Sequence, residues 1–198
     1  MPRRVPGSVL VATLVVAIAA AACGGSPIPL RTFDPASACT TDGRQPGAYP
    51  ALEALLPTEY DGKPPMSLDS GRNCTADALG SLVVDGITGV RFAGATWHLG
   101  GTTALTVAVF QADGLDAARM IRFYNAGAQA NSKTEKLALS DLTVGGRPAK
   151  RLDVLQSDGT GQTIVAWPAA DGSYVNVLLA ADLGDANVLA ALKEFGTR

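Results

Sequence analysis

An apolar segment near the N-terminus determines the compartment in which this chain folds. Residues 9–22 are almost wholly apolar and follow a short leader that carries Arg3 and Arg4. A secretory signal needs a positively charged start, an apolar stretch of about 7 to 15 residues and small residues before the cleavage site, and all three are present. The stretch is too short to span a membrane as a helix, which needs about 20 apolar residues. We therefore expect the chain to be exported.

Three alanines lead from this segment directly to Cys23, which two glycines and a serine follow. Residues 1–26 resemble the signal and lipobox of bacterial lipoproteins, although that family favours Leu where this chain has Ala20. The resemblance implies that the Cys23 thiol carries a diacylglyceryl group and that residues 1–22 are removed. It predicts a protein anchored by its lipid to the extracytoplasmic face of the cell membrane. A plain secretory peptide cut near Ala22 is the alternative, and general or twin-arginine export remains open.

The composition of the mature chain indicates one domain and no nucleic-acid partner. Removal of residues 1–22 leaves 176 of the 198 residues, which is enough for one domain. The mature chain has 14 basic and 18 acidic residues, because two of the 16 basic residues lie in the leader. No run of Lys or Arg occurs, so the charge pattern of a nucleic-acid-binding protein is absent. We expect a flexible tether over residues 23–47 and a globular domain over residues 48–198.

The three cysteines are expected to have two roles, lipidation for one and a disulfide for the other two. If Cys23 is lipidated, Cys39 and Cys74 are the remaining pair in an oxidising compartment, so we predict a disulfide between them. This bond would stabilise the fold by about 3 to 4 kcal/mol in the chain-entropy model. It would also hold the distal part of the tether. A zinc site and a catalytic thiol are both disfavoured, because His98 is the only histidine and no Cys-x-x-Cys motif occurs.

Hydrophobic periodicity predicts a single α+β domain. Helices are expected over residues 50–56, 74–85, 115–128 and 185–195, with Asn73 and Asp185 as N-caps. Strands are expected over residues 66–70, 90–99, 103–111, 137–144, 147–155, 162–167 and 174–180. The strands flanking Gly100 and Gly101 should form a hairpin, and the last four should form a meander. The result is a mainly antiparallel sheet of five to seven strands, with three to four helices packed mostly on one face.

No constellation of reactive residues emerges from the sequence. His98 would have to serve any histidine-dependent mechanism, but its position next to a turn is ordinary for a strand end. The glycine-rich residues 158–163 lack the lysine of a phosphate-binding loop and precede a strand, so they are interpreted as a hairpin turn. Asp69, Asp77 and Asp85 lack the order of a calcium loop and are interpreted as cap and surface carboxylates. The aromatic residues are expected in the core, with Trp167 as a candidate for an exposed strand end.

Three functions remain as hypotheses. The first is a non-enzymatic module, anchored to the membrane, that binds an envelope protein, a glycan or a small ligand and needs no cofactor. The second is a carrier that holds a lipid or another apolar ligand in a cavity between the sheet and the helices. The third is a hydrolase that uses dispersed carboxylates, which requires two Asp or Glu side chains to converge in one pocket. The sequence favours a protein that is not an enzyme.

Overall fold

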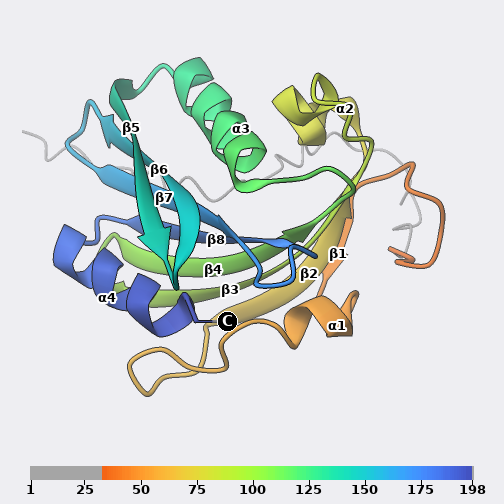
Figure 1. Cartoon of the computed structure of the whole chain (residues 1–198), viewed down its shortest axis with the longest axis horizontal. Coiled ribbons are helices and arrows are strands. Elements are labelled where there is room, and N and C mark those ends of the chain that lie inside the picture. The colour runs from red at the N-terminus through yellow and green to blue at the C-terminus, as the bar shows by residue number, and fades with distance from the viewer. Residues whose placement is uncertain (1–32, 198) are drawn as a thin grey trace, which may run out of the picture. The chain divides into compact units, whose positions relative to one another are not determined.

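The computed structural model describes residues 33–197 of the chain. The predictions for the signal segment and for the lipidated Cys23 lie outside the described residues. Residues 33–197 form one eight-stranded antiparallel sheet, in the order β1-β2-β3-β4-β8-β7-β6-β5, with helices lying against it (Figure 1). The predicted α+β class and the antiparallel sheet are therefore confirmed.

The strands are β1 (Gly43–Gln45), β2 (Ser67–Asn73), β3 (Val90–Gly100), β4 (Thr103–Gln111), β5 (Thr134–Val144), β6 (Arg147–Gln156), β7 (Gly161–Pro168) and β8 (Val175–Ala181). The α-helices are α1 (Pro50–Glu53), α2 (Ala76–Leu79), α3 (Ala117–Ala130) and α4 (Asp185–Phe195), and a 3₁₀ turn, η1 (Gly80–Val83), follows α2. None of the helices within residues 33–197 has the length and hydropathy that spanning a membrane requires.

Each strand pairs with its neighbours in sequence except at the centre of the sheet, where β4 pairs with β8. The predicted hairpin of β3 and β4 and the predicted meander from β5 to β8 are both present. Gly145 and Gly146 form the turn between β5 and β6, with φ angles of +56° and +79° that favour glycine. Two meanders are thus joined along one central ladder.

Helices cover both faces of the sheet, and the prediction that they pack mostly on one face is wrong. α3 and the neighbouring η1 lie on one face, whereas α1 and α4 lie on the other (Figure 1). In β7, Ile164 and Ala166 belong to the cluster of α3, and Val165 and Trp167 belong to the cluster of α1 and α4. The central strands are therefore apolar at consecutive positions, and both faces of such a sheet must be covered.

The eighth strand exceeds the predicted five to seven. β1 lies within residues 23–47, the expected tether, and pairs with β2 at the edge of the sheet. Gly71 permits this close approach, because a Cβ at that position would lie 2.3 Å from the carbonyl oxygen of Gly43. A three-residue polar strand has no apolar alternation, so a sequence pattern does not reveal it.

The helix predicted over residues 74–85 is interrupted. Gly80 has a φ of +49°, which ends α2 after four residues, and the chain continues as η1. The N-cap of α2 is Thr75 and not the expected Asn73, because the Thr75 side chain accepts a hydrogen bond from the Ala78 N–H at 3.3 Å. The cap and the glycine together explain the short helix.

A buried arginine attaches the segment that precedes β1 to β2. Arg72 is 3 % exposed, and its guanidinium donates to Ser37 O at 2.6 Å, to Ser37 Oγ at 2.8 Å and to Thr41 O at 3.2 Å. Its Cζ also lies 5.2 Å from the centre of the Phe33 ring, within cation–π range. We call residues 33–42 the latch segment, because Arg72 holds it through its polar backbone.

Two further contacts hold the latch segment. The predicted disulfide between Cys39 and Cys74 is present, with the Cα atoms 5.4 Å apart. The Asp42 carboxylate accepts hydrogen bonds from the N–H groups of Cys74 at 2.6 Å and Thr75 at 2.9 Å, and from the Thr75 hydroxyl. Burial raises the pKa of Asp42, but these hydrogen bonds outweigh it and hold the pKa below the ordinary value of 3.8. The part of the expected tether that follows residue 32 is thus fixed to the sheet.

Replacement of Arg72 by methionine tests the latch. The variant keeps an apolar stem but leaves the carbonyl oxygens of Ser37 and Thr41 without their donor, so we expect the free energy of unfolding to fall by about 2 to 4 kcal/mol. Urea denaturation of the full chain measures this change. Arg44→Met is the matched control, because the Arg44 side chain is 58 % exposed and makes one ion pair, with Asp69 at 3.5 Å. The control should lose less than about 1 kcal/mol, and equal losses in both variants would contradict the latch.

Candidate functional site

Two open hollows in the surface are candidates for a binding site. The larger one, of about 490 Å³, lies at the ends of β5, β6 and β7 beside the start of α4, and we call it the strand-end groove. The smaller one, of about 400 Å³, lies between α1, the ends of β3 and β4 and the turn before β8. We call it the tyrosine groove, because Tyr49 and Tyr174 line it. Both volumes fall in the range of about 300 to 1,000 Å³ that small-molecule sites occupy.

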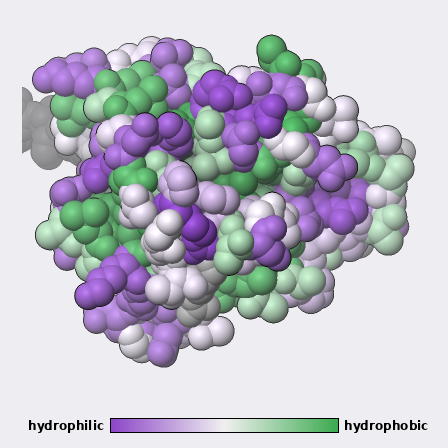
Figure 2. Space-filling view, in the orientation of Figure 1, coloured by the Kyte–Doolittle hydropathy of each residue, from purple (hydrophilic) through white to green (hydrophobic). Residues whose placement is uncertain are grey.

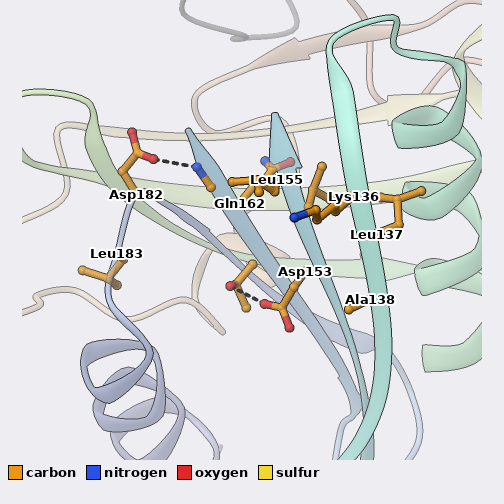
Figure 3. Close-up of a pocket in the computed structure, with 11 residues that line it drawn as sticks. Lys136, Leu137, Ala138, Asp153, Leu155, Gln162, Asp182 and Leu183 are labelled. Carbon is orange, nitrogen blue, oxygen red and sulfur yellow. Dashed lines mark hydrogen bonds between the residues drawn. The ribbon is translucent and has the colours of Figure 1, made fainter. Parts of the chain in front are cut away.

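The strand-end groove contains two carboxylates, those of Asp153 and Asp182 (Figure 3). Two carboxylates in one pocket are what the hydrolase hypothesis requires. Figure 3 shows, however, that the two side chains do not point toward one another, and each is turned to a hydrogen-bond donor of its own. The groove therefore lacks the convergent pair that acid–base hydrolysis needs.

The carboxylate of Asp153 is fully engaged by its neighbours. It accepts hydrogen bonds from Arg151 Nε at 2.7 Å, from Arg151 Nη2 at 2.9 Å and from the Thr163 hydroxyl at 2.6 Å. The hydrogen bonds that Arg151 donates to Asp153 raise the pKa of Arg151 against the opposite effect of burial. Arg151 also donates to Asp185 at 2.6 Å. Asp185, predicted as the N-cap of α4, is instead its first helical residue and connects the helix to β6.

Asp182 closes the end of the β7–β8 ladder. Its Oδ1 accepts from the Gly161 N–H at 2.7 Å, and its own N–H donates to the Gly161 carbonyl at 2.8 Å. Its φ of +48° lies in the left-handed region, which aspartate tolerates better than most residues. The carboxylates at this end of the sheet thus have structural partners, and their contacts connect β6, β7 and α4.

The tyrosine groove combines aromatic, aliphatic and polar groups from three parts of the chain. α1 contributes Leu52, its N-cap contributes Tyr49 and the turn after the helix contributes Leu55, while Arg91 and Gln111 are direct cross-strand partners at the ends of β3 and β4. The turn between β7 and β8 contributes Asp171, Ser173 and Tyr174. Apolar walls with a few polar groups are typical of ligand sites.

Tyr49 is held rigidly in this groove. Its N–H donates to the Ser70 hydroxyl at 2.7 Å, and its ring packs edge-to-face on Phe33 with the centroids 6.4 Å apart. The Cζ of Arg91 lies 5.6 Å from the centre of the same ring. Ser70 in turn donates to Glu53 of α1 at 2.8 Å. The groove wall is therefore continuous with the contacts that hold the latch segment.

Three polar side chains in the tyrosine groove form no hydrogen bond with any other residue in 33–197: the Arg91 guanidinium, the Gln111 amide and the Tyr174 hydroxyl. Asp171 accepts at Oδ1 from the Ser173 N–H at 3.0 Å and the Ser173 hydroxyl at 2.7 Å, which leaves Oδ2 as an acceptor. These hydrogen bonds lower the pKa of Asp171, the one from the Ser173 N–H most, so the carboxylate is charged at neutral pH. The tyrosine groove thus presents an arginine, an amide, a hydroxyl and a carboxylate oxygen without partners among residues 33–197, whereas both carboxylates of the strand-end groove are engaged within the fold.

One residue beneath this region escaped the sequence-based prediction. Asn176 is 5 % exposed and lies in a cross-strand row with Val109 and Trp167 on the α1 and α4 face. Its Nδ2 and the Trp167 Nε1 are buried donors without a partner among residues 33–197. A single asparagine within the apolar run of β8 is the sequence signal that would have identified it. Trp167, considered for an exposed strand end, is completely buried.

The residues that the sequence offered for catalysis or metal binding are not brought together. His98 is exposed on β3, close to the Gly100-Gly101 turn. Asp69 pairs with Arg44, whereas Asp85 accepts hydrogen bonds from Arg122 on α3. No group of three or more His, Cys, Asp or Glu side chains within residues 33–197 has the arrangement of a metal site.

The glycine-rich residues 158–163 contain the turn of the β6–β7 hairpin, as the sequence predicted. Asp158 accepts hydrogen bonds from the N–H of Thr160 at 3.0 Å and from its hydroxyl at 2.6 Å. The turn thus uses its own polar groups to hold its shape, which agrees with a structural role.

The surface offers no large apolar area on the face seen in Figure 2, where hydrophilic and hydrophobic residues form small interspersed patches. The large apolar side chains that are exposed are scattered over separate elements: Met66, Val83, Val84, Leu139 and Leu189. Scattered apolar residues are ordinary on a protein surface. The two grooves are therefore better candidates for recognition than a broad apolar interface.

Replacement of Asn176 by leucine tests whether the buried amide serves the fold. Leucine has a similar volume and removes a buried donor without a partner, so we expect the free energy of unfolding to rise by about 1 to 2 kcal/mol in urea denaturation. Ser70→Ala is the matched control, because Ser70 is a fully buried polar residue in the same cross-strand row whose hydroxyl has two partners. Ser70→Ala should lower stability by about 1 kcal/mol. A loss of stability in Asn176→Leu would show that the amide has a structural partner.

Comparisons with known proteins add no relative to this description. No protein-family model, no curated protein and no solved structure matches the chain. The function must therefore be argued from the geometry and chemistry of the grooves.

Proposed function

We propose that this chain is a lipid-anchored binding module on the extracytoplasmic face of the cell membrane, without enzymatic activity, and that it captures a small polar ligand in the tyrosine groove. The observation that carries the proposal is the convergence in one groove of Arg91, Gln111 and Tyr174, three polar side chains without partners among residues 33–197, against an aromatic and aliphatic wall. Polar groups that a fold leaves unused in a concave surface are available to a ligand.

The position of the latch segment supports a location of the tyrosine groove close to the lipid anchor. Phe33, its first residue, contacts the groove residue Tyr49. Ten residue steps separate Cys23 from Phe33, and a chain of that length reaches at most about 35 Å when fully extended. A lipid on Cys23 would therefore keep the tyrosine groove near the membrane surface, whatever conformation the intervening residues adopt.

The alternatives receive less support. A carrier of an apolar ligand needs an enclosed apolar cavity, whereas both grooves are open and carry charged groups. The space between the sheet and α4 is filled by large buried side chains such as Trp97, Trp167 and Phe195. A hydrolase would use the carboxylates of the strand-end groove, but Asp153 and Asp182 are engaged in hydrogen bonds within the fold.

The anchor is tested by Cys23→Ser in the full chain. We expect the wild-type chain to sediment with membranes and to carry an added diacylglyceryl mass on Cys23, because one thiol then links the chain to the bilayer. The serine variant should lose the added mass and leave the membrane fraction. Unchanged membrane association of the variant would contradict the lipid anchor.

The ligand site is tested by native mass spectrometry of the full chain with five separate probes: glucose, glucuronate, glutamate, benzoate and palmitate. We expect at least one of the four polar probes to form a one-to-one complex that Gln111→Ala weakens by about tenfold, because a hydrogen bond in the groove is lost. Gln162→Ala is the matched control, since Gln162 is an equally half-buried glutamine in the strand-end groove. Binding of palmitate alone would support the carrier hypothesis instead. If only Gln162→Ala weakened binding of the polar probe, the ligand site would lie in the strand-end groove.

A further inference from the structure

We infer that the ligand of the tyrosine groove is a saccharide that carries a carboxylate, an inference that rests on the proposed binding function. The groove places a guanidinium and a carboxylate oxygen, neither with a partner among residues 33–197, and a tyrosine-lined apolar wall around one space. Each of these three features selects a different property of the ligand, and the acidic sugars combine all three.

Arg91 selects an anionic group. Its guanidinium is exposed at the end of β3, and none of its nitrogen atoms pairs with a carboxylate within residues 33–197. The ring of Tyr49 lies 5.6 Å from its Cζ and orients the guanidinium from one side without using its N–H donors. A planar guanidinium with free donors matches a carboxylate, which can accept two parallel hydrogen bonds.

Asp171 selects hydroxyl groups. Its carboxylate can only accept hydrogen bonds, and Ser173 occupies one of its two oxygen atoms. The second oxygen can accept from a ligand that brings donors, and a simple aliphatic or aromatic carboxylate has none. The Gln111 amide and the Tyr174 hydroxyl can both donate and accept, as the hydroxyls of a sugar ring do.

The walls select a ring with an apolar face. Tyr49, Tyr174, Leu52 and Leu55 form the apolar part of the lining, and Tyr49 is held by a backbone hydrogen bond to Ser70 and by the packing of its ring on Phe33. A sugar ring presents C–H groups on its faces and hydroxyls at its rim, so it can lie on the apolar wall while its rim reaches the polar side chains. A rigid wall lowers the conformational entropy that binding loses.

Calorimetric titration of the full chain with glucuronate, glucose and benzoate tests the inference. We expect glucuronate to bind about tenfold or more tightly than glucose, because only glucuronate makes charge-assisted hydrogen bonds to the guanidinium. Arg91→Gln should abolish this preference and leave the affinity for glucose nearly unchanged. The matched control is Arg122→Gln, because Arg122 is an exposed arginine on α3, at the opposite face of the sheet. This variant should keep the preference.

Each other outcome overturns the inference. Equal affinity for glucose and glucuronate would show that the groove does not select an anionic group. Tighter binding of benzoate than of glucuronate would show that the groove does not select a saccharide. If neither sugar binds, the ligand class is wrong, while binding of glutamate or benzoate that depends on Gln111 would still support the proposed function. If Arg91→Gln still bound glucuronate more tightly than glucose, a group other than Arg91 would recognise the carboxylate.

Discussion

The buried guanidinium of Arg72 is the interaction on which the N-terminal side of this structure depends. The latch segment has few apolar side chains, so the hydrophobic effect alone provides little to hold it. Arg72 instead binds carbonyl and hydroxyl oxygens of Ser37 and Thr41, and the Cys39–Cys74 disulfide adds a covalent link. These contacts hold the chain beside β2, and the edge strand β1, which comes next in the sequence, pairs with β2. Separate contacts of the same strand hold α1, and hence one wall of the tyrosine groove, because the Ser70 hydroxyl of β2 accepts from the Tyr49 N–H and donates to Glu53.

The second constraint is a sheet that is apolar on both faces. Its central strands need cover from α3 on one side and from α1 and α4 on the other, and the two grooves lie beside the start of α4 and beside α1. The two hollows differ in the state of their polar groups. Asp153 and Asp182 are bound within the fold, whereas Arg91, Gln111 and Tyr174 are not. A guanidinium without a carboxylate partner among residues 33–197, set against an aromatic wall, distinguishes the tyrosine groove more than its volume does.

The sequence predicted the features that have a local signal. Apolar alternation and glycine pairs identified the β3–β4 hairpin and the meander from β5 to β8, and the count of cysteines identified Cys39–Cys74. The disulfide was expected to hold the distal part of the tether, but strand β1 and the contacts of Arg72 were missed, because hydrogen bonds from Arg72 to a distant polar segment leave no periodic pattern. The tyrosine groove was missed for a related reason. Arg91 and Tyr174 lie far apart in the chain and meet only through the pairing of β4 with β8.

That central pairing also sets an order for assembly. The strands β1 to β4 and β5 to β8 each form ladders between sequence neighbours, whereas the β4–β8 seam must close a loop over residues 112–174. Loop closure of this length opposes folding through its entropy, so local ladders form before the seam. The tyrosine groove straddles the seam, with Gln111 on one side and Tyr174 on the other. A half-assembled chain consequently lacks the site, and an occupant that bridges both sides strengthens the junction between the two halves.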